Sequence, residues 1–169
     1  MSNKSKPRAH LYQIDLPVLD DDGNPADAAT IKQILEEYDV FESLEAGEKM
    51  PEGMVKRMNA RGTMLDVKKT LLGIVKQPKG QGGMNFDDLD QVKPLVTLLK
   101  EADTGTAVYL EEGDYKILRE RTKDYKGWSG YRDSVLVLRD NIMNAKKVPF
   151  EIAKPEADED VTDSANHKE

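Results

Sequence analysis

The chain has no cysteine and only two histidines, His10 and His167, among its 169 residues. Without cysteine it can form neither a disulfide nor a thiolate zinc or iron–sulfur site. Two histidines at opposite ends of the sequence do not predict a histidine-based metal site or a catalytic triad. No apolar run approaches the roughly 18 residues of a membrane span, and no apolar segment follows the basic N-terminus. We therefore expect a cytoplasmic protein without a bound metal or cofactor.

Hydrophobic residues are also scarce, at 38% against 34% charged residues, and the net charge is −7. The acid is concentrated at the end of the chain, because residues 151–169 hold seven acidic and two basic side chains, a net of −5. Little apolar content is available there, or in the first nine residues, to offset the entropy of ordering. We predict a disordered basic arm over residues 1–9, one domain over 10–154 and a disordered acidic tail over 155–169.

Hydrophobic periodicity predicts a mainly α fold, a compact domain of about five helices with two or three short strands. Pro17 is expected to confine the first strand to an edge, and Pro94 to kink or split a helix. We expect the last helix to begin at Ser129 or Gly130. The helices are expected over residues 26–46, 54–59, 63–77, 85–99, 111–125 and 129–145, and the strands over 10–19, 104–110 and 148–153.

The acidic motifs do not predict a catalytic or calcium site. Asp20, Asp22 and Asn24 alternate as in a calcium loop, but Pro25 and Ile31 replace the required glycine and bidentate glutamate. Two further carboxylate clusters, at residues 87–90 and 111–114, lie where helices are expected to begin. Negative charge is favourable at a helix N-terminus without any active site. We therefore expect no enzyme.

The glycine- and lysine-rich segment "KQPKGQGG" is similar in composition to a phosphate-binding loop. A Walker loop requires Gly-Lys-Ser/Thr after a strand, whereas here Gly80 is followed by Gln81, and the preceding segment is expected to be helical. The segment therefore predicts a flexible connection between two helices.

Basic side chains gather in two stretches. Residues 115–132 carry a net charge of +4 and include the only tryptophan, Trp128, and residues 54–80 carry +6. Positive surface with aromatic rings is typical of nucleic-acid binding, but the tyrosines also fall on the apolar stripes of their helices. We expect Trp128 to fill the corner between two helices, near Tyr125 and Tyr131, and the outer basic face to remain available to a partner. The candidate partner-binding residues are Arg119, Arg121, Lys123, Lys126, Trp128 and Arg132.

Four segments carry a resemblance to a known family: "LPVLDDDGNP", "TMLDVKKTLLGIV", "VYLEEGDYKILRERT" and "SVLVLRDNIMNA". They resemble small accessory proteins of tailed bacteriophages, which have a short extended arm, a turn with Asp, Gly and Pro, and a helix that begins near a threonine. The resemblance runs over residues 11–145. It implies a structural, assembly or host-directed role without catalytic residues, in the cytoplasm of the host cell or in the virion.

Two functions from different classes remain open from the sequence. The favoured one is a non-enzymatic protein-interaction module that binds a phage protein, a host protein or a second copy of itself. The alternative is a nucleic-acid-binding accessory protein that uses the basic residues of 54–80 and 115–132. The alternative adds Lys68, Lys69, Lys76 and Lys79 to the candidate residues. Binding to nucleic acid should weaken steeply with salt, because released counterions drive it.

Overall fold

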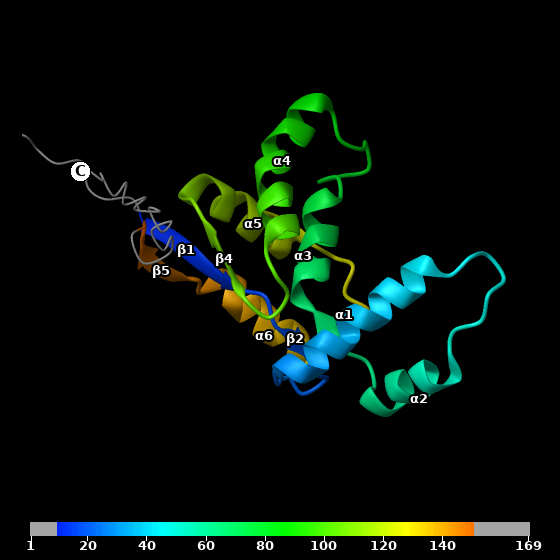
Figure 1. Cartoon of the computed structure of the whole chain (residues 1–169). Helices are drawn as coiled ribbons and strands as arrows, with labels where there is room; N and C mark the ends of the chain where they lie inside the picture. The colour runs from blue at the N-terminus through cyan, green and yellow to red at the C-terminus, as the bar shows by residue number, and fades with distance from the viewer. Residues whose placement is uncertain (1–9, 151–169) are drawn as a thin grey trace, which may run out of the picture.

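The computed structural model describes residues 10–150 and confirms a mainly α fold with short strands. This part of the chain holds six helices, close to the number expected (Figure 1). The predicted arm, the predicted acidic tail and the end of the strand expected over 148–153 lie outside the described residues. The helices are α1 (Ala28–Ser43), α2 (Glu52–Arg61), α3 (Val67–Lys76), α4 (Phe86–Glu101), α5 (Glu112–Asp124) and α6 (Asp133–Met143).

A three-stranded antiparallel sheet is built around the first strand. β1 (His10–Asp15) lies between β4 (Ala107–Leu110) and β5 (Lys146–Pro149), with Tyr12 opposite Leu110 and Leu11 opposite Val148. The prediction that Pro17 makes this an edge strand is wrong. β1 ends at Asp15, so the proline lies beyond the ladder and removes no hydrogen bond from it.

A second, two-stranded sheet explains why α3 begins later than the sequence predicts. β2 (Val18–Leu19) pairs with β3 (Leu65–Asp66), a strand that the sequence did not predict. Because this pairing holds the backbone extended, the helix begins at Val67 and not at Thr63. The side chain of Asp66 caps the helix by accepting a hydrogen bond from the amide of Lys69 at 3.1 Å.

The core lies where α3, α4 and α5 pack together and where α5 and α6 contact the three-stranded sheet. The faces predicted from helical periodicity are confirmed here, because apolar residues at those spacings are buried. The fully buried core side chains include Ile14, Leu16, Val67, Leu71, Leu95, Leu99, Leu110, Leu118, Leu138 and Ile142.

Tyr115 connects three elements of this core. Its ring, on α5, stacks on that of Tyr12 in β1, with centroids 3.9 Å apart and an interplanar angle of 14°. Its hydroxyl donates to the carbonyl of Ile142 in α6 at 2.8 Å. The polar end of a mostly buried ring is therefore satisfied, as such rings require.

Several apolar residues expected in the core are exposed. The prediction that the last helix begins at Ser129 or Gly130 is wrong. α6 begins at Asp133, two residues after Tyr131, and Tyr131 is therefore 81% exposed. Phe86 and Leu89 lie in the first turn of α4, where their side chains remain exposed, as do those of Leu35 and Phe41 on α1. Hydrophobic periodicity identified the apolar face of each helix. It did not show along how much of the helix a neighbouring element covers that face.

α1 and α2 extend away from the three-stranded sheet, at the opposite end of the molecule from β5 (Figure 1). Their share of the core is small, since only Ile34, Glu37 and Met54 are buried on them. The residues that alternate as in a calcium loop form a turn before α1. Asp20 accepts hydrogen bonds from the amides of Asp22 and Asn24 at 3.0 and 2.8 Å.

α4 begins with a complete capping box. The Asn85 side chain accepts from the amide of Asp88, and the Asp88 side chain accepts from the amide of Asn85. The helix continues as one element through Pro94, so the expectation of two pieces is wrong. Pro94 is exposed, away from the core.

Asn85→Ala should lower the free energy of unfolding by about 1 kcal/mol, because it removes the side-chain acceptor of the cap. Urea denaturation followed by circular dichroism measures this. Thr97→Ala, on the exposed side of the same helix, is the control and should change stability by about 0.5 kcal/mol or less. Equal effects of the two substitutions would show that the cap does not hold α4.

Candidate functional site

The stretch "RTKDYKGWSGYR" covers the end of α5 and the connection to α6. The chain leaves the helix at Tyr125 and enters α6 at Asp133. Tyr125 folds back over Gly127, where a Cβ would overlap the tyrosine ring, so any larger residue at this position would displace that ring. The connection is thus held against the end of α5 by an aromatic side chain.

Trp128 is half-buried and packs against the main core. Its ring meets that of Tyr125 edge to face, with centroids 4.8 Å apart and an interplanar angle of 80°. This is the corner position expected from the sequence, except that Tyr131 points into solvent and takes no part. Trp128 therefore supports the connection and still presents part of its surface.

A groove of about 530 Å³ lies between α5 and α6, with Trp128 in its wall. Its apolar surface comes from aromatic, aliphatic and methionine side chains, and three basic residues from the two helices complete it. We call this the α5–α6 groove, and its lining residues are Arg119, Thr122, Lys123, Tyr125, Trp128, Val135, Leu136, Arg139, Met143 and Asn144.

The charges of the α5–α6 groove are uniformly positive. Arg139 is paired with its exposed neighbour Asp140 at 2.9 Å, whereas Arg119 and Lys123 form no ion pair with any residue of 10–150. Among residues 10–150, no carboxylate or imidazole lines the groove. The surface can therefore attract an acidic ligand and cover its apolar side chains, but it has neither of the groups that most often act as general base.

The other predicted residues of this stretch lie elsewhere. Arg121 and Lys126 line a separate hollow of about 380 Å³ beside the end of α3, together with Lys79. Arg132 is exposed just before α6 and lines neither cavity. Tyr125 lines both, so one ring separates the two basic surfaces.

The prediction that Arg121 is a surface residue is wrong, because its side chain is only 6% exposed. It follows Leu118 by three residues, which places it on the buried side of α5. One guanidinium nitrogen, Nη1, donates to the carbonyl of Gln77 at the C-terminal end of α3. Arg121 therefore joins α3 to α5, and it also lines the hollow beside the end of α3.

The alternative nucleic-acid residues do not form one continuous surface. Lys68 donates to the carbonyls of Lys100 and Ala102 at the end of α4, at 3.1 and 2.5 Å. Lys69 turns toward α1, where its Nζ lies 3.2 Å from the ring centroid of Tyr38. Lys76 lines a different cavity, against α4. Of the four, only Lys79 lies beside the basic residues of α5.

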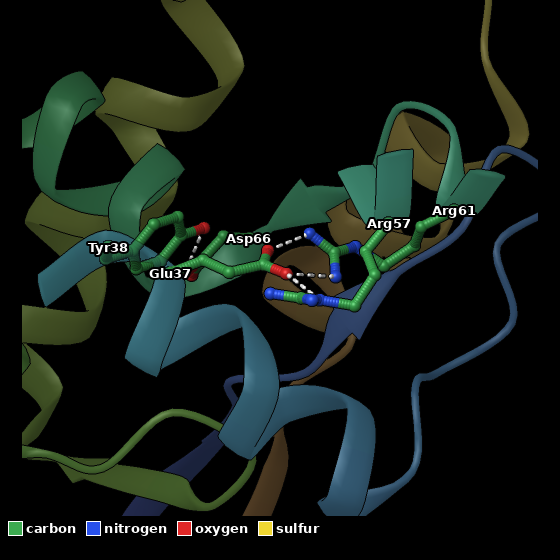
Figure 2. Close-up of polar contacts among 5 residues, drawn as sticks. All are labelled: Glu37, Tyr38, Arg57, Arg61 and Asp66. Carbon is green, nitrogen blue, oxygen red and sulfur yellow. Dashed lines mark hydrogen bonds and ion pairs between the residues drawn. The ribbon is translucent and has the colours of Figure 1, made fainter. Parts of the chain in front are cut away.

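A buried ionic network joins α1 to α2, and sequence reasoning missed it (Figure 2). Glu37 is only 5% exposed and accepts hydrogen bonds from both terminal nitrogens of Arg61. Arg57 approaches the same carboxylate, with Nε 3.5 Å from Oε1. The hydrogen bonds from Arg61 hold the pKa of Glu37 below its usual range, although burial opposes this. One carboxylate thus fixes two arginines of α2 against α1.

A tyrosine–aspartate contact continues this network toward α3. The hydroxyl of Tyr38 donates to Oδ2 of Asp66 at 3.3 Å, as Figure 2 shows. Burial, with the nearby charge of Asp66, raises the pKa of Tyr38 to about 12. Tyr38 therefore remains protonated at neutral pH and acts as a hydrogen-bond donor. Because these groups are satisfied by one another, we interpret the network as a structural link.

No family model matches the chain, and no curated protein or solved structure is significantly similar to it. Among the helices within residues 10–150, none is long and apolar enough to cross a bilayer. In the same part of the chain, no three His, Asp or Glu side chains are grouped where they could hold a metal ion.

Proposed function

We propose that the protein is a non-enzymatic protein-interaction module whose α5–α6 groove binds an acidic segment of a protein partner. The observation that carries the proposal is the combination in one groove of an apolar surface, containing Trp128, with the cations Arg119 and Lys123, which form no ion pair within residues 10–150. Binding sites between proteins are typically enriched in Trp, Tyr, Met and Arg, and all four line this groove.

The partner segment should alternate acidic with apolar residues. Apolar side chains would cover Trp128, Leu136 and Met143, and this burial supplies the main favourable term. Carboxylates would face Arg119, Lys123 and Arg139, where complementary charge mainly increases the association rate and the selectivity.

We also propose that this binding serves a structural, assembly or host-directed role in a tailed bacteriophage. This part rests on the resemblance of residues 11–145 to small accessory proteins of such phages. A phage or host protein that carries an acidic, apolar segment would be the partner, and self-association through the same groove is an outcome that sedimentation of the purified chain would detect.

Nucleic-acid binding is the second candidate, and one observation favours it. The two basic stretches approach each other in the fold, because Lys79 and Lys126 line one hollow. Against it, Lys68 and Lys69 are engaged by the end of α4 and by Tyr38. Binding that falls steeply between 50 and 200 mM salt, regardless of sequence, would favour this candidate.

Selection from a peptide-display library tests the proposal without knowledge of the partner. The wild-type chain should enrich peptides that carry several Asp or Glu residues together with Leu, Phe or Trp. Selected peptides are then synthesised, and their affinity is measured by fluorescence anisotropy at 150 mM salt. Enrichment of basic or purely polar peptides would contradict the proposed groove chemistry.

Reversing two charges of the groove, with Lys123→Glu and Arg139→Glu, should weaken binding of a selected peptide at least tenfold. The reason is that like charges would then face the acidic residues of the peptide. The matched control is Lys32→Glu with Lys93→Glu, which makes the same change in net charge at exposed positions of α1 and α4. If both double variants weaken binding equally, peptide binding depends only on the net charge of the protein, and the groove is not the binding site.

A further inference from the structure

Arg121 is a buried cation without a carboxylate partner among residues 10–150. Its side chain is 6% exposed, and it forms no ion pair with any residue of 10–150. Its Nε is fully covered and has no hydrogen-bond acceptor among those residues, and only Nη1 is bonded, to the carbonyl of Gln77. Burying a guanidinium is costly unless it is paired, so the burial of Arg121 with a single hydrogen bond requires an explanation.

Two further cations converge on the hollow that Arg121 lines. Lys79 enters from the connection after α3 and Lys126 from the connection after α5, whereas Asp124 is the only carboxylate that the described part of the chain contributes to the lining. Three cations therefore face one acid around a single cavity. Gly80 lines it as well, and nothing lies within 4 Å of a Cβ built on that glycine, so its backbone is open to a ligand.

The remaining lining of the hollow can hold the organic part of a ligand. Ile74, Pro78 and Tyr125 contribute apolar and aromatic surface beside the cations. The volume of about 380 Å³ exceeds what one inorganic anion fills and lies in the range of small-molecule sites. A strand of nucleic acid would require a continuous row of cations, and Lys68 and Lys69 do not extend the hollow.

We propose that this hollow binds a small phosphate-bearing molecule, with the phosphate held by Arg121, Lys79 and Lys126. A guanidinium and two ammonium groups match the charge and hydrogen-bonding capacity of a phosphomonoester dianion. The phosphate would supply the negative charge that Arg121 lacks, and the rest of the ligand would contact Tyr125 and Pro78. The site is separate from the α5–α6 groove, although Tyr125 borders both.

Isothermal titration calorimetry of the full chain at 150 mM salt tests this with four probes. Adenosine 5′-monophosphate and ribose 5-phosphate should both bind, and inorganic phosphate should bind more weakly, because it lacks the organic part. Adenosine, which has no phosphate, should give no binding heat. Equal binding of adenosine and its monophosphate, or no binding of either phosphate ester, would overturn the proposal.

Variants identify the position of the site. Lys79 and Lys126 are both exposed, so replacing them should not disrupt the fold. The double variant Lys79→Ala/Lys126→Ala should weaken binding of adenosine 5′-monophosphate at least tenfold, because two charge-assisted contacts are removed. The matched control is Lys76→Ala with Lys123→Ala, which alters neighbouring lysines that do not line the hollow. Arg121→Met is measured alongside, with circular dichroism to verify folding. Wild-type affinity in the Lys79/Lys126 variant would refute the assignment.

Two comparisons separate this site from the proposed groove and from nucleic acid. The affinity of the Lys123→Glu/Arg139→Glu variant for the monophosphate should lie within about twofold of the wild-type affinity, even though this variant no longer binds the acidic peptide. A single-stranded oligonucleotide without a terminal phosphate should not displace the monophosphate. Displacement by the oligonucleotide would assign the hollow to nucleic acid and overturn the small-ligand proposal.

Discussion

Leu138→Ala should lower the free energy of unfolding by about 2 to 4 kcal/mol, because it removes a fully buried side chain and leaves a cavity. Leu138 has no exposed surface and belongs to the main core, where α6 meets the sheet and α5. Val67→Ala, at the first residue of α3, should fall at the lower end of this range, since fewer carbons are removed. Urea denaturation gives both values.

The chain offers a matched control for Leu138 in its immediate neighbour. Val137 lies on the same helix, is 40% exposed, and should tolerate alanine at a cost well below that of Leu138. Comparable losses for Val137→Ala and Leu138→Ala would show that α6 is rotated from the orientation described. A loss below about 1 kcal/mol for Leu138→Ala would place that residue outside the core.

Glu37→Ala should destabilise the protein by about 2 to 3 kcal/mol, because it leaves Arg61 largely buried without its carboxylate. The expected loss is smaller than for a fully buried pair, since the second arginine, Arg57, is half exposed and can be solvated. Hydrogen exchange of α1 and α2 localises the effect, because these helices bury few other residues. Glu36→Ala, at the exposed neighbour, should have little effect.

The contribution of Glu37 should also depend on pH. Its pKa is lower in the folded than in the unfolded chain, so its stabilisation is present above the unfolded pKa and is lost as pH falls through the folded pKa. The difference in unfolding free energy between wild type and Glu37→Gln should therefore be full at pH 7 and shrink on acidification. A difference that stays constant into the acid range would contradict the ion pairs with Arg61 and Arg57.

Local signals explain why much of the helical structure could be predicted. Asn85 caps α4 through contacts within four residues, and the periodic apolar residues of α3 and α6 mark the faces that are buried. The start of α3 was misplaced because the pairing of β3 with β2 joins segments more than 45 residues apart. The residues around Thr63 contain no local sequence signal for such a pairing.

The site was partly predictable for the same reason. Arg119, Lys123 and Trp128 meet in one groove because they lie at the end of one helix and in the connection that follows it. The burial of Arg121 and Glu37 was missed, although each follows a buried apolar residue, Leu118 and Ile34, by three positions. That spacing was the available signal, but the charge of Arg121 led us to expect exposure, and Glu37 was not singled out from the sequence.

The emission of Trp128, the only tryptophan, tests the central claim most directly, because this residue lines the α5–α6 groove. The full chain is titrated at 150 mM salt with an acidic, apolar peptide from the display selection, and separately with single-stranded DNA. The proposed groove predicts a saturable shift of the emission with the peptide, absent in the Lys123→Glu/Arg139→Glu variant, and no comparable change with DNA. Saturable quenching by DNA that disappears at higher salt, with no response to the peptide, would contradict it.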